Sequence, residues 1–208
     1  RVDRRQRQMC IRDSSHATLY ALQTLRDEQD LKPEQIERIE VRVNEITNYL
    51  INNGNPKTPY GCKFSLQYCC AAMLVNGVVG IEEFTDRAIA NPAVKALMRR
   101  VFVVPNEEEE AIHQANPSKL ASTVLVTLTD GTVLTRHVDF PKGDPDNPLS
   151  WEEAKKKFLH LAVPVLGQAS SHALFQLILH LEKADDFALA LAEADLSVPP
   201  PATGQSMI

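Results

Sequence analysis

The chain has 208 residues, of which 44% are hydrophobic and 24% are charged, close to the average for soluble globular proteins. Collagen-like, disordered and disulfide-scaffold classes are therefore excluded. No apolar run approaches the roughly 20 residues that a membrane span needs, so we expect a cytoplasmic protein with no membrane partner. The formal net charge of -5 argues against a nucleic-acid partner.

The first fourteen residues need a separate interpretation because they show neither periodicity nor an apolar face. They contain five of the 22 Lys and Arg residues and resemble translated sequencing-adapter sequence. We therefore predict that residues 1–14 are not native and exclude them from fold reasoning. The remaining chain carries 17 basic against 25 acidic residues, a balance of -8. The alternative is a disordered basic arm.

The four cysteines, Cys10, Cys62, Cys69 and Cys70, show no C-x-x-C spacing, which argues against a zinc site. Cys69 and Cys70 lie within an apolar run, where free cysteine usually behaves as a small buried hydrophobe. A reducing compartment fits best, and we expect neither a metal nor a cofactor.

In the first third of the chain, apolar residues recur every three or four positions from His16 to Asp30, a spacing typical of an amphipathic helix. Residues 38–43 alternate apolar and polar side chains and predict a strand with one exposed face. A loop rich in Asn, Gly and Pro is expected at residues 52–59.

A buried helix is predicted at residues 66–76, because nearly all of its side chains are apolar. Ser65 is suited to be its N-cap, and Gly77 to end it. Two short helices are predicted at residues 82–90 and 93–100. The second follows a proline suited to a first helical turn.

Residues 101–104 favour a strand, and the run Glu107–Glu110 is interpreted as a solvated face. Asp130-Gly131 lies between two runs rich in Val, Leu and Thr, which is the strongest hairpin pattern in the chain.

Ser150, with Glu153 three residues later, forms a capping box that opens a helix over residues 151–166. Pro164 is expected to kink or end this helix. Helical patterns return at residues 172–184 and 186–194.

The order of these elements predicts an α+β fold. We expect an α+β domain at residues 15–147, C-terminal helices at 148–196, and a disordered tail at 197–208 that contains three consecutive prolines.

Chemistry is expected mainly at the start of the predicted helix 66–76. Lys63 and the free amides after Ser65 combine fixed charge and donors, which favour a carboxylate or phosphate. The simpler interpretation is a capped core helix with a solvated lysine.

His16 opens the first helix, where the helix dipole favours the neutral ring that a general base requires. The simpler alternative is a capping or surface histidine. Tyr49 and Asn48, in the polar segment after the first predicted strand, could reach a site as hydrogen-bond donors, and the simpler alternative for them is that they are surface loop residues.

Several segments together carry a family resemblance. They are S-H-A-T-L-Y-A-L from Ser15, L-K-P-E-Q-I-E-R-I-E-V-R-V from Leu31, K-F-S-L-Q-Y-C-C-A-A-M-L-V-N-G from Lys63, V-T-L-T-D-G from Val126, G-D-P-D-N-P-L-S from Gly143 and K-K-F-L at 156–159. Their order and spacing resemble the C-terminal half of the MmgE/PrpD family over about residues 15–190.

The resemblance implies enzymes such as 2-methylcitrate dehydratase, cis-aconitate decarboxylase and iminodisuccinate epimerase, which move a proton beside a carboxylate without needing a metal. It also implies a homodimer in which the active site lies between a large helical domain and a smaller α/β lid. Residues 15 to about 145 would be the lid. The helices after Ser150 would pack on a helical domain that is missing from this sequence, and most of the acid/base residues would belong to that domain.

The resemblance further implies roles for single residues. His16 fits a histidine near the start of the first lid helix, and we predict that it is a catalytic acid/base or orienting residue. Tyr20 stands where relatives often have an acidic residue, and Lys63 where some have histidine, so the subtype stays open. Lys63 and Ser65 are predicted to bind a small di- or tricarboxylate, with Tyr49 as a further contact.

We therefore expect a fragment of a hydro-lyase that is inactive by itself. The alternatives are an epimerase, racemase or decarboxylase of the same family, or a non-catalytic interaction module.

Overall fold

The computed structural model describes residues 13–183 together with residues 188 and 191, and the structural statements below refer to these residues. They separate into two compact units, one ending at Asn147 and the other beginning at Pro148, and each is described by itself. The predicted tail at 197–208 lies outside the described residues, as do residues 1–12 and most of the predicted helix 186–194.

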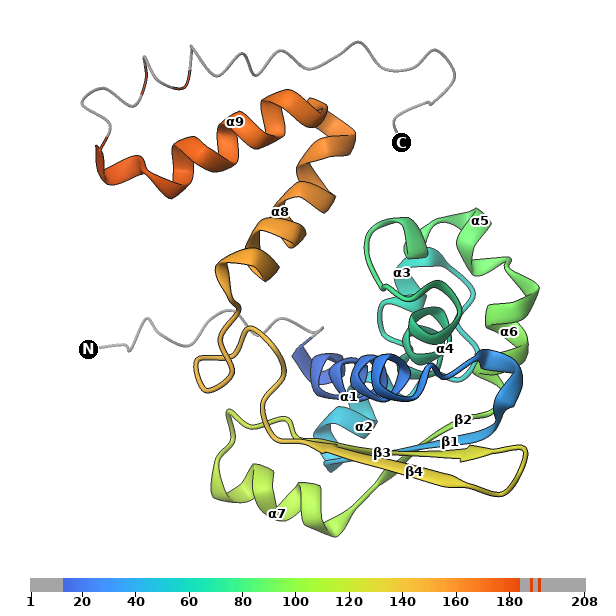
Figure 1. The fold of residues 1–208 in the computed structure, drawn as a ribbon. Helices are drawn as coiled ribbons and strands as arrows, with labels where there is room; N and C mark the ends of the chain where they lie inside the picture. Colours follow the sequence, from blue (N-terminus) through green and yellow to red (C-terminus); the bar gives the residue numbers. More distant parts are fainter. Residues whose placement is uncertain (1–12, 184–187, 189–190, 192–208) are drawn as a thin grey trace. The chain divides into compact units, whose positions relative to one another are not determined.

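The first unit combines short helices with one sheet (Figure 1). Its elements in chain order are α1 (Asp13–Gln29), the 3-10 helix η1 (Pro33–Gln35), β1 (Ile36–Val43), α2 (Glu45–Ile51), α3 (Pro59–Cys62), α4 (Leu66–Asn76), the 3-10 helix η2 (Glu82–Phe84), α5 (Asp86–Ile89), α6 (Pro92–Met98), β2 (Val101–Pro105), α7 (Glu107–Ala115), β3 (Ser122–Leu128) and β4 (Val133–Val138). None of the helices in the described part is long and apolar enough to span a bilayer.

The sheet of the first unit has the strand order β2-β1-β3-β4. β1 is parallel to β2, with Ile39 opposite Val101, and antiparallel to β3, with Val41 opposite Val124. The predicted hairpin is confirmed as β3 and β4, and Gly131 in its turn has φ 87°, a backbone conformation that favours glycine. This mixture of helices and a mixed sheet confirms the α+β class.

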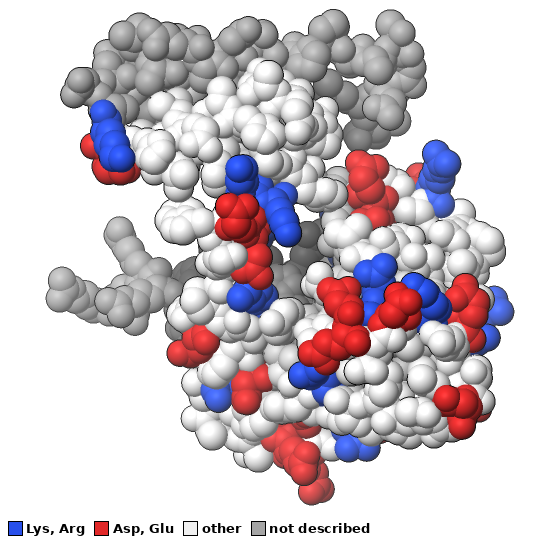
Figure 2. All heavy atoms as spheres, in the orientation of Figure 1, with Lys and Arg blue, Asp and Glu red and all other residues white. Residues whose placement is uncertain are grey.

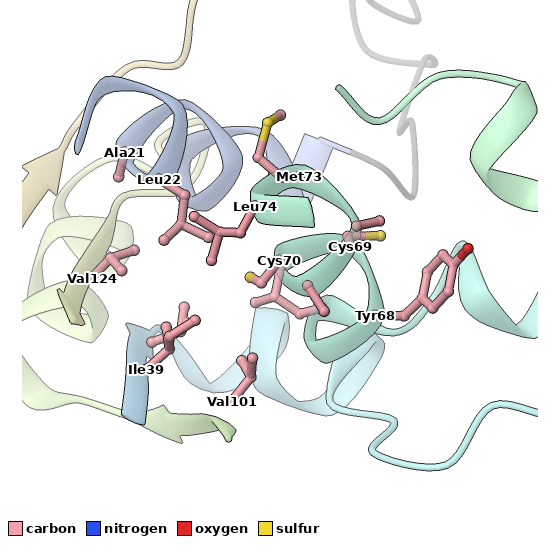
Figure 3. Packing of buried hydrophobic residues seen from close by; sticks show 14 of the residues in the cluster. Ala21, Leu22, Ile39, Tyr68, Cys69, Cys70, Met73, Leu74, Val101 and Val124 are labelled. Atoms are coloured by element: carbon pink, nitrogen blue, oxygen red, sulfur yellow. The ribbon is translucent and has the colours of Figure 1, made fainter. Parts of the chain in front are cut away.

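The core of the first unit lies between one sheet face and helices α1 and α4. Alternate strand residues such as Ile39 and Val124 are fully buried on this face, as the period-two geometry of strands requires. Figure 3 shows Leu22 of α1 and Leu74 of α4 in the space between these helices and the two strand residues. Helix α4 is therefore packed against α1 and the sheet through buried side chains.

Helix α4 begins and ends at the predicted residues. The Ser65 hydroxyl accepts a hydrogen bond from the Tyr68 N–H, which satisfies one of the free donors of the first turn. Gly77 ends the helix with φ 81°, and a Cβ there would lie 2.9 Å from a guanidinium nitrogen of Arg26. The left-handed backbone favours glycine at this helix end, whereas the Arg26 side chain could move aside for a Cβ.

Two short helices occupy parts of the chain that we predicted as polar segment or loop. Asn44 caps α2 by accepting a hydrogen bond from the Thr47 N–H at 2.7 Å, so Tyr49 lies on a helix. Within the predicted loop 52–59, Thr58 caps α3 and Pro59 occupies its first position. Side-chain caps immediately after a strand or a loop therefore start helices that hydrophobic periodicity does not reveal.

The acidic run was predicted to be a solvated face, and for Glu109 that prediction is wrong. Residues 107–110 form the first turn of α7, where acidic side chains are favoured, but the Glu109 side chain is only 1% exposed. Its carboxylate accepts a hydrogen bond from the Thr123 hydroxyl on β3, and His137 Nδ1 lies 3.6 Å from the same carboxylate oxygen. The hairpin thus supplies partners to Glu109 Oε1, whereas Oε2 is buried without a hydrogen-bond partner among the described residues.

The second unit consists of α8 (Trp151–Leu166), α9 (Gln168–Leu179) and the 3-10 helix η3 (Leu181–Lys183). The predicted capping box is confirmed, because the Ser150 N–H donates to the Glu153 carboxylate and the Glu153 N–H donates to the Ser150 hydroxyl. Phe158 and Phe175 join the two helices, with ring centroids 5.5 Å apart.

Pro164 neither ends nor interrupts α8, contrary to one of the two outcomes we predicted. A proline removes one hydrogen bond, to the carbonyl four residues earlier, and that residue, His160, is exposed to water.

Figure 2 shows that the visible face of α9 carries no charged side chain, in keeping with its sequence. The apolar side chains of Leu161, Val165 and Ile178 are 44–55% exposed.

Candidate functional site at the start of helix α4

Ser65 is the buried centre of the helix end where the sequence predicts an anion site. Its side chain is fully buried and makes two hydrogen bonds, accepting from the Tyr68 N–H at 3.1 Å and donating to the Asn53 carbonyl at 2.5 Å. Its single hydroxyl proton is therefore already used within the protein. The hydroxyl fixes the loop after α2 against the first turn of α4.

A second pair of side chains strengthens the same junction. The Gln67 side-chain amide donates to Asn52 Oδ1, and the Asn52 amide donates to Asn48 Oδ1 at 2.9 Å and to the Val103 carbonyl at 3.3 Å. These bonds join α4, α2 and β2. The first turn of α4 is therefore fixed by the Ser65 hydroxyl and by the Gln67 amide. Residues fixed in this way can support a binding site.

Lys63 lies between α3 and the Ser65 cap and is half-buried. Among the described residues, no carboxylate lies within ion-pair distance of its ammonium group. The Nζ atom lies instead 5.8 Å from the centroid of the Phe84 ring. Lys63 therefore supplies a positive charge beside the start of α4 that no acidic side chain of the described chain neutralises.

Two buried side chains close to Lys63 in the chain, Tyr68 and Cys62, have raised pKa values. The Tyr68 hydroxyl donates to the Glu83 carbonyl, and burial, followed by the nearby Cys62, Cys69 and Glu83, raises the pKa of Tyr68 well above its ordinary value. Burial also raises the pKa of Cys62. Tyr68 and Cys62 therefore stay neutral near pH 7 and supply no anion to Lys63, and the buried Glu83 carboxylate accepts its hydrogen bond from the Gly80 N–H instead.

The other two predicted site residues lie on different elements. His16 is exposed in the first turn of α1, which begins at Asp13 rather than at His16. Tyr49 is 87% exposed on α2. Lys63 and Ser65 both lie just before α4 in the chain. His16 and Tyr49 lie on separate helices and stay predictions.

Sequence reasoning missed Asn52, Gln67 and Phe84 at this junction. Their contacts depend on how α2, α4 and η2 pack, and no local spacing indicates them. Asn52 and Gln67 belong to segments whose only sequence features are loop composition and helix hydrophobicity.

Two surface cavities of the first unit contain none of the predicted site residues. One, of about 390 Å³, is lined by α2 and α7 residues that include Glu45, Glu107 and Glu110. The other, of about 340 Å³, lies near Arg26 and Lys32 at the far end of α1. In the described part of the chain, no three His, Cys, Asp or Glu side chains are grouped as metal ligands. The chemistry near Lys63 therefore does not coincide with either cavity.

Comparison with known families matches residues 12–183 to the MmgE/PrpD C-terminal domain. The chain belongs to the MmgE/PrpD family. It is 26% identical to cis-aconitate decarboxylase of Mus musculus over 153 residues, which cover 74% of the chain and 30% of that protein. It is 31% identical to 2-methylcitrate dehydratase of Cupriavidus necator over 114 residues, or 52% of the chain and 23% of that protein.

A third relative, cis-aconitate decarboxylase of Homo sapiens, is 27% identical over 156 residues, which cover 75% of the chain and 31% of that protein. The chain thus spans less than a third of the length of these curated relatives. Their two names describe different reactions of small carboxylates, a dehydration and a decarboxylation.

Proposed function

We propose that this chain is the substrate-binding C-terminal portion of a lyase that acts on a small di- or tricarboxylate, with 2-methylcitrate dehydration as the model reaction. The observation that carries the proposal is the half-buried Lys63, which has no carboxylate partner in the described chain and lies beside the capped start of α4. Decarboxylation and epimerisation within the same family are the alternatives.

Lys63 is the proposed anchor for one substrate carboxylate, because a charge-assisted hydrogen bond is stronger than a neutral one. Ser65 contributes as the cap that orients the helix end, since its proton is donated to Asn53. The positive end of the α4 dipole adds to the attraction for an anion. Tyr49, which is exposed on α2, is a further proposed contact.

His16 is the proposed acid/base or orienting residue of this portion. Removing a proton beside a carboxylate creates enolate-like negative charge, and a fixed cation such as Lys63 stabilises that charge as it develops. The position of His16 in the first turn of α1 favours its neutral form through the helix dipole, which is the form that accepts a proton.

The whole protein is proposed to act as a cytoplasmic homodimer, with further acid/base residues outside this sequence. The 208-residue chain is expected to bind substrate weakly and to show no turnover. Turnover of 2-methylcitrate or cis-aconitate by the isolated chain would contradict this expectation.

Binding of citrate, a small tricarboxylate, tests the proposal. At constant ionic strength, Lys63→Gln should weaken citrate binding to the 208-residue chain about tenfold, because one charged hydrogen bond is worth roughly 1.5 kcal/mol. Lys95→Gln, an exposed lysine on α6, is the matched control and should leave the affinity unchanged. Equal effects of the two substitutions, or no citrate binding by the unsubstituted chain, would overturn the proposal.

A further inference from the structure

The Lys63 ammonium group lies over an aromatic ring and has no acidic partner within ion-pair distance among the described residues. A cation that loses part of its hydration needs compensation from its surroundings. In the described chain this compensation comes from Phe84, whose ring centroid lies 5.8 Å from Lys63 Nζ. This separation falls within the range of about 6 Å over which a ring face attracts a cation.

Phe84 is itself held in place by the first turns of α4. Its ring packs against the Tyr68 ring, with centroids 5.9 Å apart, and it is partly buried against the hydrophobic core. The Tyr68 hydroxyl donates to the carbonyl of Glu83, the residue before Phe84. The Glu83 carboxylate accepts a hydrogen bond from the Gly80 N–H at 2.7 Å, which closes the turn around η2. The ring therefore occupies a fixed position relative to Lys63.

We propose that Phe84 is a positioning residue for Lys63 in the carboxylate site. The inference rests on the proposed function and adds to it a reason why the anchor is effective. An aromatic face restricts the rotamers of the lysine, and so reduces the entropy that substrate binding must remove. Unlike a neighbouring Asp or Glu, it does so without cancelling the positive charge.

The electrostatic consequence distinguishes this arrangement from an ordinary lysine salt bridge. A carboxylate beside Lys63 would compete with the substrate carboxylate for the same ammonium donors. The ring carries no net charge and is a much weaker partner for the ammonium than a carboxylate, so it competes little with an incoming anion for the N–H donors. The pair of Lys63 and Phe84 therefore forms a cationic anchor that is ready for an anionic ligand.

A double-mutant cycle on the 208-residue chain, with citrate as the probe, tests the proposal. Phe84→Leu removes the ring face and keeps an apolar side chain, so citrate should bind about two- to fivefold more weakly. Phe84→Tyr keeps the ring and should restore the affinity to within twofold. In a Lys63→Gln background, Phe84→Leu should have no effect, because there is no cation left to position.

Phe140→Leu is the matched control, because Lys119 Nζ lies 4.4 Å from the Phe140 ring centroid in a second lysine–phenylalanine pair. It should leave citrate affinity unchanged. An equal loss from Phe84→Leu with and without Lys63 would reduce Phe84 to a packing residue and overturn the inference. So would unchanged affinity in Phe84→Leu.

A measurement on the unsubstituted chain covers the case in which Phe84→Leu does not fold. Ring currents should shift the Lys63 Hε protons upfield in the NMR spectrum, and citrate should change that shift. Lys63 Hε protons at ordinary positions would overturn the inference even if citrate binds, and would leave the proposed function intact. Failure of citrate to bind at all would overturn both.

Discussion

The hydroxyl of Ser65 provides the sharpest test of how α4 is seated. Replacing Ser65 with alanine removes two hydrogen bonds at once, the cap to the Tyr68 N–H and the bond to the Asn53 carbonyl. Losing an N-cap typically costs about 1 kcal/mol. The part-buried hydrogen bond to the carbonyl of the exposed Asn53 is also lost, at a cost of about 0.5–1.5 kcal/mol. Ser65→Ala should therefore lower the unfolding free energy of the first unit by roughly 1.5–2.5 kcal/mol.

Thr85→Ala is the matched control, because the Thr85 hydroxyl makes the same two kinds of bond on the surface. It accepts from the Ala88 N–H at 3.2 Å and donates to the Glu82 carbonyl at 3.1 Å, and it is exposed. Water replaces both bonds after substitution, so this variant should lose no more than about 1 kcal/mol.

Hydrogen exchange of β1 amides under mild denaturant is the suitable assay. The chain has one tryptophan, Trp151, which lies at the start of α8, so its fluorescence reports on the second unit. The most protected amides of β1 exchange through unfolding of the first unit. If Ser65→Ala costs no more than Thr85→Ala, burial of the cap adds nothing, and the account of this helix end is wrong.

Three further predictions concern the cores and pH. Leu22→Ala, at a fully buried position, should lower the unfolding free energy of the first unit by about 2–5 kcal/mol, measured by exchange of β1 amides. Burial raises the pKa of the Cys70 thiol well above its ordinary value, so its contribution to stability is complete below the ordinary thiol pKa of about 8.5 and decreases above it as the unfolded chain ionises. Urea titrations at pH 8 and 10 should show this decrease, and Cys70→Ala should reduce it. Phe175→Leu removes the ring contact with Phe158 and should lower the free energy of opening in α9, measured by amide exchange, by about 0.5–1.5 kcal/mol. Exchange of the β1 amides should not change.

Features that depend on a few neighbouring residues could be predicted from the sequence. The bounds of α4, the turn at Gly131 and the Ser150 capping box are set by caps and glycines that act over three or four residues. The apolar character of α4 also predicted its burial, and nine of its residues are buried. Local chemistry and burial agree at these positions.

Features that depend on distant contacts could not be predicted. The buried Glu109 finds partners for one carboxylate oxygen in Thr123 and His137, which lie opposite each other on the hairpin. Similarly, Tyr68 ties η2 to α4 and so contributes to the position of Phe84 near Lys63. The candidate site was thus predictable as a helix end with a lysine, whereas the side chains that hold it follow from tertiary packing.

A citrate titration monitored by the backbone amide NMR signals of the 208-residue chain tests the central claim most directly. We predict saturable shifts confined to Lys63 and the first turn of α4, with no comparable shifts around the cavity near Glu110. Shifts centred on that cavity, or no saturable shifts at all, would contradict the assignment of the carboxylate site to this helix end.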